Sequence, residues 1–178
     1  INCGSGAAVD NIFASPGGTM EFWIYPTGWG ESSYGRFADK GVSSGWRFYV
    51  NNNEVTAGAS FYHDATPDGQ WNTGANTMTL NQWNHVVLTF DKSSINNNPT
   101  IYVNGVANTL TKYYTPGGSF LTDDSENLNI GNRPAEDRTF AGRIDECRFS
   151  DIMRSAAWIK TEYNNQNSPS TFCSIGDE

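Results

Sequence analysis

The chain has 178 residues, of which 37% are hydrophobic and only 17% charged, and its net charge is −8. This length fits one domain, because a single core of such a size can bury about 70% of the unfolded surface. The negative charge argues against nucleic acid and anionic membranes as partners, since both are bound through basic surfaces. No run of about 18 apolar residues occurs, so we expect no membrane insertion.

Apolar and polar residues alternate in several short segments, and this period of two indicates β-strands. Met20, Phe22 and Ile24 share one face of the first segment. The same alternation recurs in three later segments, residues 46–50, 86–90 and 101–103. Asn104 and Gly105 follow the last of these and predict a two-residue hairpin, because a type I′ turn needs positive φ at both positions.

Residues 155–165 form the only segment with helical spacing. Ser155 is a suitable N-cap, and the apolar pair Trp158 and Ile159 precedes Glu162 by three to four residues. We expect a short surface helix whose apolar pair covers one edge of a sandwich, and we assign the remaining strand-associated tryptophans, Trp23 and Trp83, to the core or its edge. Many short strands with almost no helix predict an all-β, two-sheet antiparallel sandwich.

Several motifs, taken together in their order, carry a family resemblance. They are MEFWIYPTGWG (20–30), LNQWNHVVLTFD (80–91), TIYVNGV (100–106), LNIGNR (128–133) and FAGRIDECRFSDIMRSAAWI (140–159). In this order they resemble the laminin G-like domains of the concanavalin A-like lectin/glucanase superfamily. The resemblance implies a jelly roll over residues 1–166, with one short helix near its end. We expect residues 167–178 to be an extended tail.

Domains of this kind commonly bind carbohydrate or protein and are appended to larger proteins. The resemblance therefore implies a non-catalytic binding module that recognises a glycan, is stabilised by calcium, and belongs to a longer multidomain chain that is extracellular or at the cell surface. Ile1 lies within what reads as a strand, which agrees with a domain taken from a longer chain. Two alternatives stay open: a structural or adhesive domain of a surface or virion protein that contacts protein, and a glycan-active enzyme.

The adjacent acids Asp145 and Glu146 are the obvious candidates for catalysis. Neighbours on a strand point to opposite faces, so we expect this pair not to flank one glycosidic bond. The E-x-D-x-x-E pattern that catalytic members of the resembled superfamily carry is missing here. We expect His85 to be a packed strand residue and Glu146 to be an exposed one, and we predict no catalytic residue.

A metal site is the alternative use of Asp145. Strand parity places this residue with Cys147 and Phe149, facing the edge of the core, where a charge needs a partner. The resemblance implies that Asp145 helps to bind a structural calcium ion, with companions from the N-terminal segment: Asn2, Ser5 and Asp10. Hydrogen bonds from backbone amides, or pairing with a neighbouring arginine (Arg143 or Arg148), would satisfy Asp145 equally well.

Three cysteines, Cys3, Cys147 and Cys173, lack the spacing of a metal site. We expect Cys147 to face the interior. The resemblance places the N-terminal strand beside residues 144–149, so Cys3 could pair with Cys147, and Cys173 is the rival partner. A buried free thiol at Cys147 remains open.

A sugar site combines an aromatic face with polar groups that bind hydroxyls. Residues 61–72 read as one long loop that holds four such candidates, Tyr62, His63, Asp64 and Trp71, and Tyr34 is a fifth. For each aromatic taken alone, packing at the edge of the sandwich is a more common role than ligand binding. Arg133 and Arg138 could line the same rim, although salt bridges within their loop are an equal alternative.

Overall fold

The computed structural model describes residues 1–51 and 55–172. The strands of one large sheet are β1 (Gly18–Pro26), β7 (Asn84–Phe90), β8 (Thr100–Val103), β9 (Val106–Ala107) and β13 (Gly142–Ser150). Those of the other are β2 (Arg36–Lys40), β3 (Trp46–Asn51), β4 (Thr56–Phe61), β6 (Gly69–Thr73), β10 (Leu110–Tyr114) and β12 (Leu128–Ile130). The remaining elements are β5 (His63–Ala65), β11 (Gly117–Phe120), the 3-10 turn η1 (Glu31–Ser33) and the helices α1 (Ala156–Asn167) and α2 (Pro169–Phe172).

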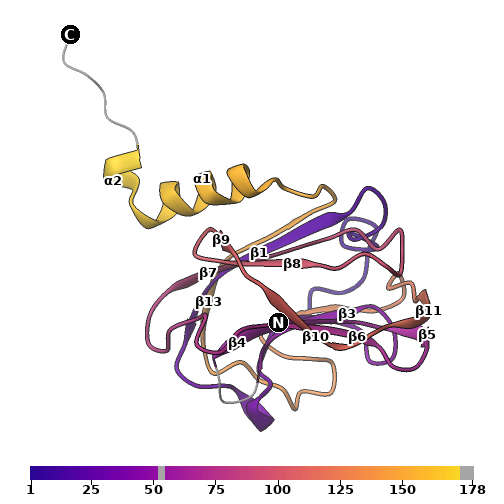
Figure 1. The fold of residues 1–178 in the computed structure, drawn as a ribbon. Coiled ribbons are helices and arrows are strands. Elements are labelled where there is room, and N and C mark those ends of the chain that lie inside the picture. The colour runs from indigo at the N-terminus through magenta and orange to yellow at the C-terminus, as the bar shows by residue number, and fades with distance from the viewer. Residues whose placement is uncertain (52–54, 173–178) are drawn as a thin grey trace.

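The two large sheets form the two layers of a sandwich (Figure 1). The five-stranded sheet has the order β13-β1-β7-β8-β9, and the six-stranded sheet has the order β10-β6-β4-β3-β2-β12. Strands β11 and β5 form a separate two-stranded ribbon. Every strand pair within these sheets is antiparallel, which confirms the predicted two-sheet antiparallel sandwich.

The core lies between the sheets and is built from the alternating residues that the sequence predicts. Met20, Phe22 and Ile24 are all 0% exposed. Phe13, which precedes β1, fills the centre and meets Trp46 and Phe61 edge to face, with ring centroids 5.7 and 5.2 Å apart. Each such side chain contributes about 1.5–3 kcal/mol of transfer free energy, so the aromatic core fixes the register of both sheets.

The predicted hairpin joins β8 to β9. Asn104 has φ 52° and Gly105 has φ 73°, so both turn residues occupy the left-handed region. Glycine adopts this region freely and asparagine tolerates it, which explains the choice of residues. The hairpin prediction is confirmed.

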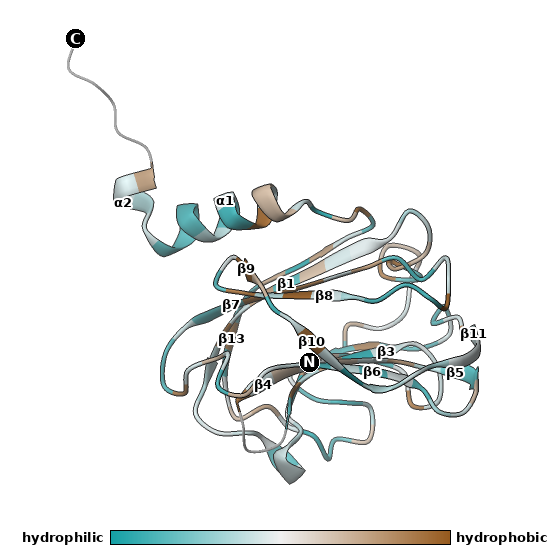
Figure 2. Ribbon diagram, in the orientation of Figure 1, coloured by the Kyte–Doolittle hydropathy of each residue, from teal (hydrophilic) through white to brown (hydrophobic). Residues whose placement is uncertain are grey.

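Helix α1 lies over the outer face of the five-stranded sheet (Figure 1). Ser155 caps it as predicted, since its hydroxyl accepts a hydrogen bond from the Trp158 amide at 3.2 Å. Ile159 is 0% exposed and packs against Val87 and Tyr102 of the sheet. Figure 2 shows that most of the remaining helix is hydrophilic, so apolar packing is concentrated near its start.

The chain beyond α1 differs from the predicted extended tail where it is described. Residues 169–172 form the short helix α2, and residues 173–178, with Cys173, lie outside the described residues. Within residues 1–51 and 55–172, none of the helices is both long and apolar enough to cross a membrane.

The N-terminal residues pair with the six-stranded sheet. Asn2 lies opposite Asn129 of β12, and the Cys3 amide donates to the Leu128 carbonyl at 2.8 Å. The predicted pairing of this segment with residues 144–149 is therefore wrong, because β12 offers the free sheet edge. Cys3 and Cys147 are exposed and not bonded to each other, so the interior placement of Cys147 is also wrong. Partial burial of its sulfur raises the pKa of the Cys147 thiol, and the nearby Asp145 and Cys3 raise it further.

Candidate functional site

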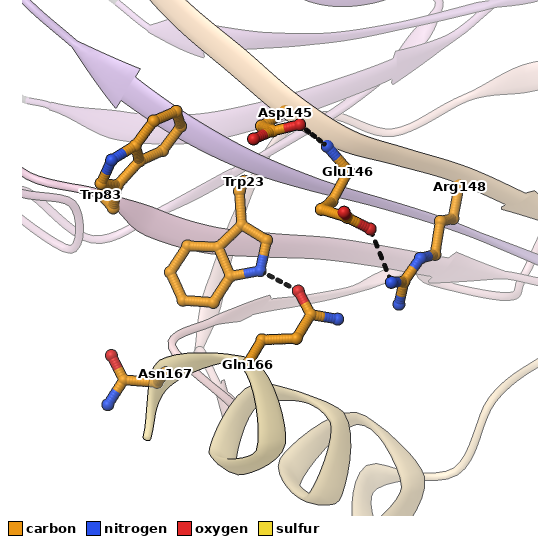
Figure 3. Close-up of a pocket in the computed structure, with 7 residues that line it drawn as sticks. All are labelled: Trp23, Trp83, Asp145, Glu146, Arg148, Gln166 and Asn167. Atoms are coloured by element: carbon orange, nitrogen blue, oxygen red, sulfur yellow. Dashed lines mark hydrogen bonds and ion pairs between the residues drawn. The ribbon is translucent and has the colours of Figure 1, made fainter. Parts of the chain in front are cut away.

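A cleft of about 490 Å³ lies between the outer face of the five-stranded sheet and the C-terminal end of α1 (Figure 3). Its lining comes from β1, the residue before β7, β13 and α1: Trp23, Trp83, Asp145, Glu146, Arg148, Gln166 and Asn167. The volume falls within the range of about 300–1,000 Å³ that is typical of small-molecule sites. The cleft is therefore large enough for a small organic ligand.

The two acids Asp145 and Glu146 both line this cleft (Figure 3). Between the pairs Glu21–Arg148 and Trp23–Asp145, β13 has one residue more than β1, and Glu146 has φ 50°. This β-bulge interrupts the alternation of side chains, so the prediction that the two acids point to opposite faces is wrong. Asp145 is exposed, so the prediction from strand parity that it faces the edge of the core is also wrong.

An ionic network centred on Arg148 forms one side of the cleft. Its guanidinium lies 3.1 Å from Oε1 of Glu21 and 2.6 Å from Oε2 of Glu146, and it also pairs with Glu162 of α1. Glu21 is only 2% exposed, and its other neighbour is Nε2 of His85 at 3.4 Å. His85 is 0% exposed, which confirms that it is a packed strand residue. The network neutralises a buried carboxylate and fastens α1 to the sheet.

The two tryptophans of the cleft have different surroundings. Trp23 is half-buried, donates its indole N–H to Gln166 and stacks on Tyr163, with centroids 6.0 Å apart and planes at 22°. Trp83 is 42% exposed and touches only the edge of Tyr25 among the described aromatic rings, at 5.6 Å. Trp23 therefore holds the helix, whereas Trp83 offers an apolar ring to solvent.

Sequence reasoning missed this role for Trp83, although a signal was present. Val86, Leu88 and Phe90 face the core, so the odd-numbered positions of the same strand face outward. Trp83 stands one residue before that strand and has the outward parity of Val87. A tryptophan on this face lies outside the core between the sheets and can present its ring to solvent, as Trp83 does.

The chemistry of the cleft suits a polyol. An exposed indole can stack on the apolar C–H face of a sugar ring. Around it, the carboxylates of Asp145 and Glu146 accept hydrogen bonds, and the amides of Gln166 and Asn167 can donate or accept them. The hydroxyl groups of a sugar both donate and accept hydrogen bonds. The cleft offers acceptors and donors beside one aromatic ring, so it matches such a ligand.

The predicted ligand residues of segment 61–72 do not gather at one surface. Trp71 is 1% exposed and lies in β6, so its placement in a long loop is wrong and its ring cannot reach a ligand. His63 is 6% exposed, its Nδ1 accepts from the Gly69 amide at 3.3 Å, and burial lowers its pKa. Asp64 accepts from the Ser119 amide at 2.6 Å and so joins β5 to β11.

The other two predicted ligand residues lie on the opposite sheet. Tyr34 lines a smaller hollow on the outer face of the six-stranded sheet. The hydroxyl of Tyr62 accepts a hydrogen bond from Arg47 at 3.2 Å beside that hollow. Tyr34 and Tyr62 are thus brought to one face, apart from Trp71, His63 and Asp64.

Three of the four residues predicted to bind calcium have protein partners in the structure, and the calcium site stays a prediction. The carboxylate of Asp10 pairs with the Lys40 ammonium at 2.8 Å, and that of Asp145 accepts from the Glu146 amide at 2.8 Å. The side chain of Asn2 accepts from the Gly4 amide at 2.8 Å, and Ser5 is exposed. In the part of the chain that the structure describes, no three His, Cys, Asp or Glu side chains converge as a metal site.

Two antiparallel sheets packed face to face, with a single helix of more than one turn in the described chain, are the architecture of a concanavalin A-like jelly roll. The chain belongs to the concanavalin A-like lectin/glucanases superfamily, whose laminin G-like family description matches residues 4–170. This membership confirms the resemblance predicted from the ordered motifs. No curated protein sequence matches the chain.

Several solved structures share the fold. The binding domain of Paraclostridial Mosquitocidal Protein 1 superposes with a TM-score of 0.69 at 11% identity, over 94% of this chain and 41% of that one. A putative carbohydrate binding protein from Bacteroides ovatus gives 0.60 at 16% identity, over 88% and 42% of the two chains. The Ruminococcus gnavus IT-sialidase CBM40 bound to alpha2,3 sialyllactose gives 0.60 at 15% identity, over 80% of each chain. The chain spans less than half the length of the first two structures.

Proposed function

We propose that the chain is a non-catalytic carbohydrate-binding module and that its saccharide lies in the cleft of Figure 3. The observation that carries the proposal is Trp83, a tryptophan 42% exposed beside two carboxylates and two amides. Membership of a lectin-type superfamily supports it. Two of the similar structures are described as carbohydrate-binding proteins, which supports the same ligand class.

The surroundings of the two acids support binding without catalysis. A general acid for glycoside hydrolysis needs a carboxyl group whose pKa is raised by an apolar or like-charged environment. Asp145 is exposed, and Glu146 is exposed and paired with Arg148 at 2.6 Å, so neither acid lies in an apolar pocket. The carboxylate oxygens of both acids are open to accept hydrogen bonds from hydroxyl groups.

The module belongs, in this proposal, to a longer secreted or surface protein. The structures it resembles include the binding domain of a mosquitocidal protein and the CBM40 of a sialidase, and two of the similar structures are more than twice as long as the matched part. A glycan on a cell surface or in the extracellular matrix is then the partner. The proposed binding does not depend on calcium, because the side chains that line the cleft supply the hydrogen-bonding groups themselves.

A glycan array tests the proposal. Wild-type protein and the Trp83→Ala variant are compared at equal concentration, with and without chelator. We expect the wild-type protein to bind a defined set of saccharides, and the variant to lose that signal in both buffers. Binding to no saccharide, or binding that the variant retains in full, would contradict the proposal. Release of sugar from any array glycan would contradict its non-catalytic part.

A further inference from the structure

Arginines gather at a hollow of about 230 Å³ on the outer face of the six-stranded sheet, the face opposite α1. Four of the chain's eleven lysines and arginines line it: Arg36, Arg47, Arg133 and Arg138. The other lining residues are two tyrosines and a glutamine, so no lining residue is acidic within the described chain. Such a concentration of positive charge is unexpected in a protein whose net charge is −8.

The strands and one loop explain why these arginines meet. On β3, Trp46, Phe48 and Val50 enter the core, so Arg47 and Tyr49 project from the outer face. Arg36 opens the neighbouring strand β2. The arrangement brings a pair of guanidinium groups and a tyrosine ring onto one surface of the sheet.

The loop that follows β12 supplies the other two arginines. The amides of Arg133 and Arg138 both donate to Oδ1 of Asn132 at 2.9 Å, which folds the loop into a compact turn. The Arg36 amide donates to the Arg138 carbonyl at 3.0 Å, which holds this turn against β2. The hollow is therefore a built feature in which loop and sheet are joined by backbone hydrogen bonds.

Internal acids neutralise only part of this charge. Asp39 pairs with Arg36 at 2.8 Å, and Asp137 pairs with Arg133 and lies 3.7 Å from Arg138. Four arginines against these two aspartates leave a local charge of +2. In the described residues Arg47 makes no ion pair: it donates to the hydroxyls of Tyr62 and Ser60 at 3.2 Å each.

Arg47 is therefore positioned to accept a new anionic partner. Its guanidinium lies 5.0 Å from the centre of the Tyr62 ring, a cation–π contact that orients the group. A planar guanidinium binds carboxylate and sulfate oxygens through two parallel hydrogen bonds. The volume of the hollow is below the usual range of about 300–1,000 Å³, so it suits one charged sugar unit rather than an oligosaccharide.

We propose that this hollow is a second saccharide site, which binds the anionic group of an acidic sugar unit, a carboxylate or a sulfate, through Arg47, Arg133 and Arg138. The proposal rests on the carbohydrate-binding function and adds a ligand class to it. Tyr34 and Tyr49, whose rings are 6.0 Å apart, and the amide of Gln70 provide contacts to the remainder of the sugar. The hollow and the cleft of Figure 3 lie on opposite sheets, so each binds its own saccharide unit.

Three probes that share one core test the proposal: lactose, 3′-sialyllactose and 3′-sulfolactose. Their affinities are measured by titration calorimetry at low and physiological salt. We expect at least one acidic probe to bind about tenfold or more tightly than lactose, and its affinity to fall as salt rises. The acid that binds better identifies the anionic group. Equal affinity for all three probes, or binding of neither acidic one, would overturn the proposal.

Variants then locate the site. Arg47→Met and Arg138→Met each remove one guanidinium from the hollow, and Arg143→Met removes the same charge from the exposed part of the opposite sheet. We expect the first two to abolish the preference for the acidic probe and the third to retain it, with thermal melting used to confirm that each variant is folded. An equal loss in all three would show nonspecific attraction and overturn the proposal. Array binding that depends on Trp83 would persist in either case, so this failure is distinguishable from failure of the proposed function.

Discussion

The Nζ atom of Lys40 lies 2.8 Å from Oδ1 of Asp10 and is wholly buried. The same ammonium donates to the carbonyls of Asp123 and Glu126, at 2.6 and 2.9 Å, and lies 3.7 Å from the carboxylate of Asp123. One lysine thus joins the N-terminal segment, β2 and the loop before β12. Oxygen atoms of this kind also bind calcium, but here a side-chain cation satisfies them.

Lys40→Met should lower the free energy of unfolding by about 3–5 kcal/mol, because it leaves the fully buried Asp123 without a cation. Urea unfolding followed by tryptophan fluorescence measures the change. Lys160→Met is the matched control, since Lys160 is exposed on α1 and its loss should have little effect. A loss at Lys40 no larger than that at Lys160 would show that the buried ion pair is not important for stability.

Calcium should not change the melting temperature of the wild-type protein. Asp10 is neutralised by Lys40, and the carboxylate of Asp145 already accepts a backbone amide hydrogen bond. Scanning calorimetry in calcium and in chelator provides the measurement. A rise of several degrees in calcium, which Asp145→Asn removes, would instead establish the calcium site predicted from the sequence.

Asp39 should make stability depend on pH in a defined direction. Burial raises the pKa of its carboxyl group to about 6, although Arg36, Arg47 and Arg133 act to lower it. The unfolded chain loses this proton near the ordinary pKa of 3.8, so between about pH 4 and pH 6 the folded state binds more protons. This carboxyl group therefore contributes a loss of stability as the pH rises through that window.

The comparison with Asp39→Asn isolates this contribution, because asparagine does not titrate. Unfolding free energies of both proteins are measured from about pH 4 to pH 7. The stability of the wild-type protein relative to the variant should fall as the pH rises to about 6 and then level off. A difference that stays constant, or that increases with pH, would contradict the assignment.

Arg148→Met should loosen α1. Arg148 is shared by Glu21, Glu146 and Glu162, and its removal leaves the imidazole of His85 as the remaining neighbour of the buried Glu21 in this network. We expect a loss of about 1–3 kcal/mol, the usual cost of depriving a buried charged group of its hydrogen bond.

Hydrogen exchange of the amides of residues 156–167 measures the local effect. Faster exchange is expected in Arg148→Met than in Arg143→Met, an exposed arginine of the same strand. Similar protection of α1 in both variants would show that the apolar contact of Ile159 alone holds the helix.

The sandwich could be predicted from the sequence because burial repeats at a period of two. Met20, Phe22 and Ile24 all enter the core, as their alternation predicts, and the Asn104–Gly105 turn depends only on local φ preferences. Strand β6 was not predicted because Trp71 is the only one of its five residues in the hydrophobic core. A single apolar residue cannot show the alternation that marks a strand. Local signals were sufficient where the side chains themselves carry the pattern.

The candidate site depends on strand pairing and long-range contacts, which a single sequence does not reveal. The β-bulge that directs Asp145 and Glu146 into one cleft arises from the pairing of β13 with β1. More than a hundred residues separate these two strands in the sequence, so no local pattern predicts the bulge. Arg36 and Arg138 also lie far apart in the sequence, and the topology of the sheet brings them together. Lys40 has no local feature that distinguishes a buried lysine from an exposed one. These relationships required the three-dimensional structure.

The most direct test of the central claim is titration calorimetry with the saccharide that gives the highest array signal. Wild-type protein is compared with Trp83→Ala and with Tyr113→Ala, which truncates an exposed aromatic residue outside the cleft. Trp83→Ala should weaken binding about tenfold or more, because tryptophans that contact a ligand are often binding hot spots, while Tyr113→Ala should bind like the wild type. Equal affinity of Trp83→Ala and the wild-type protein would contradict the assignment of this cleft as the saccharide site.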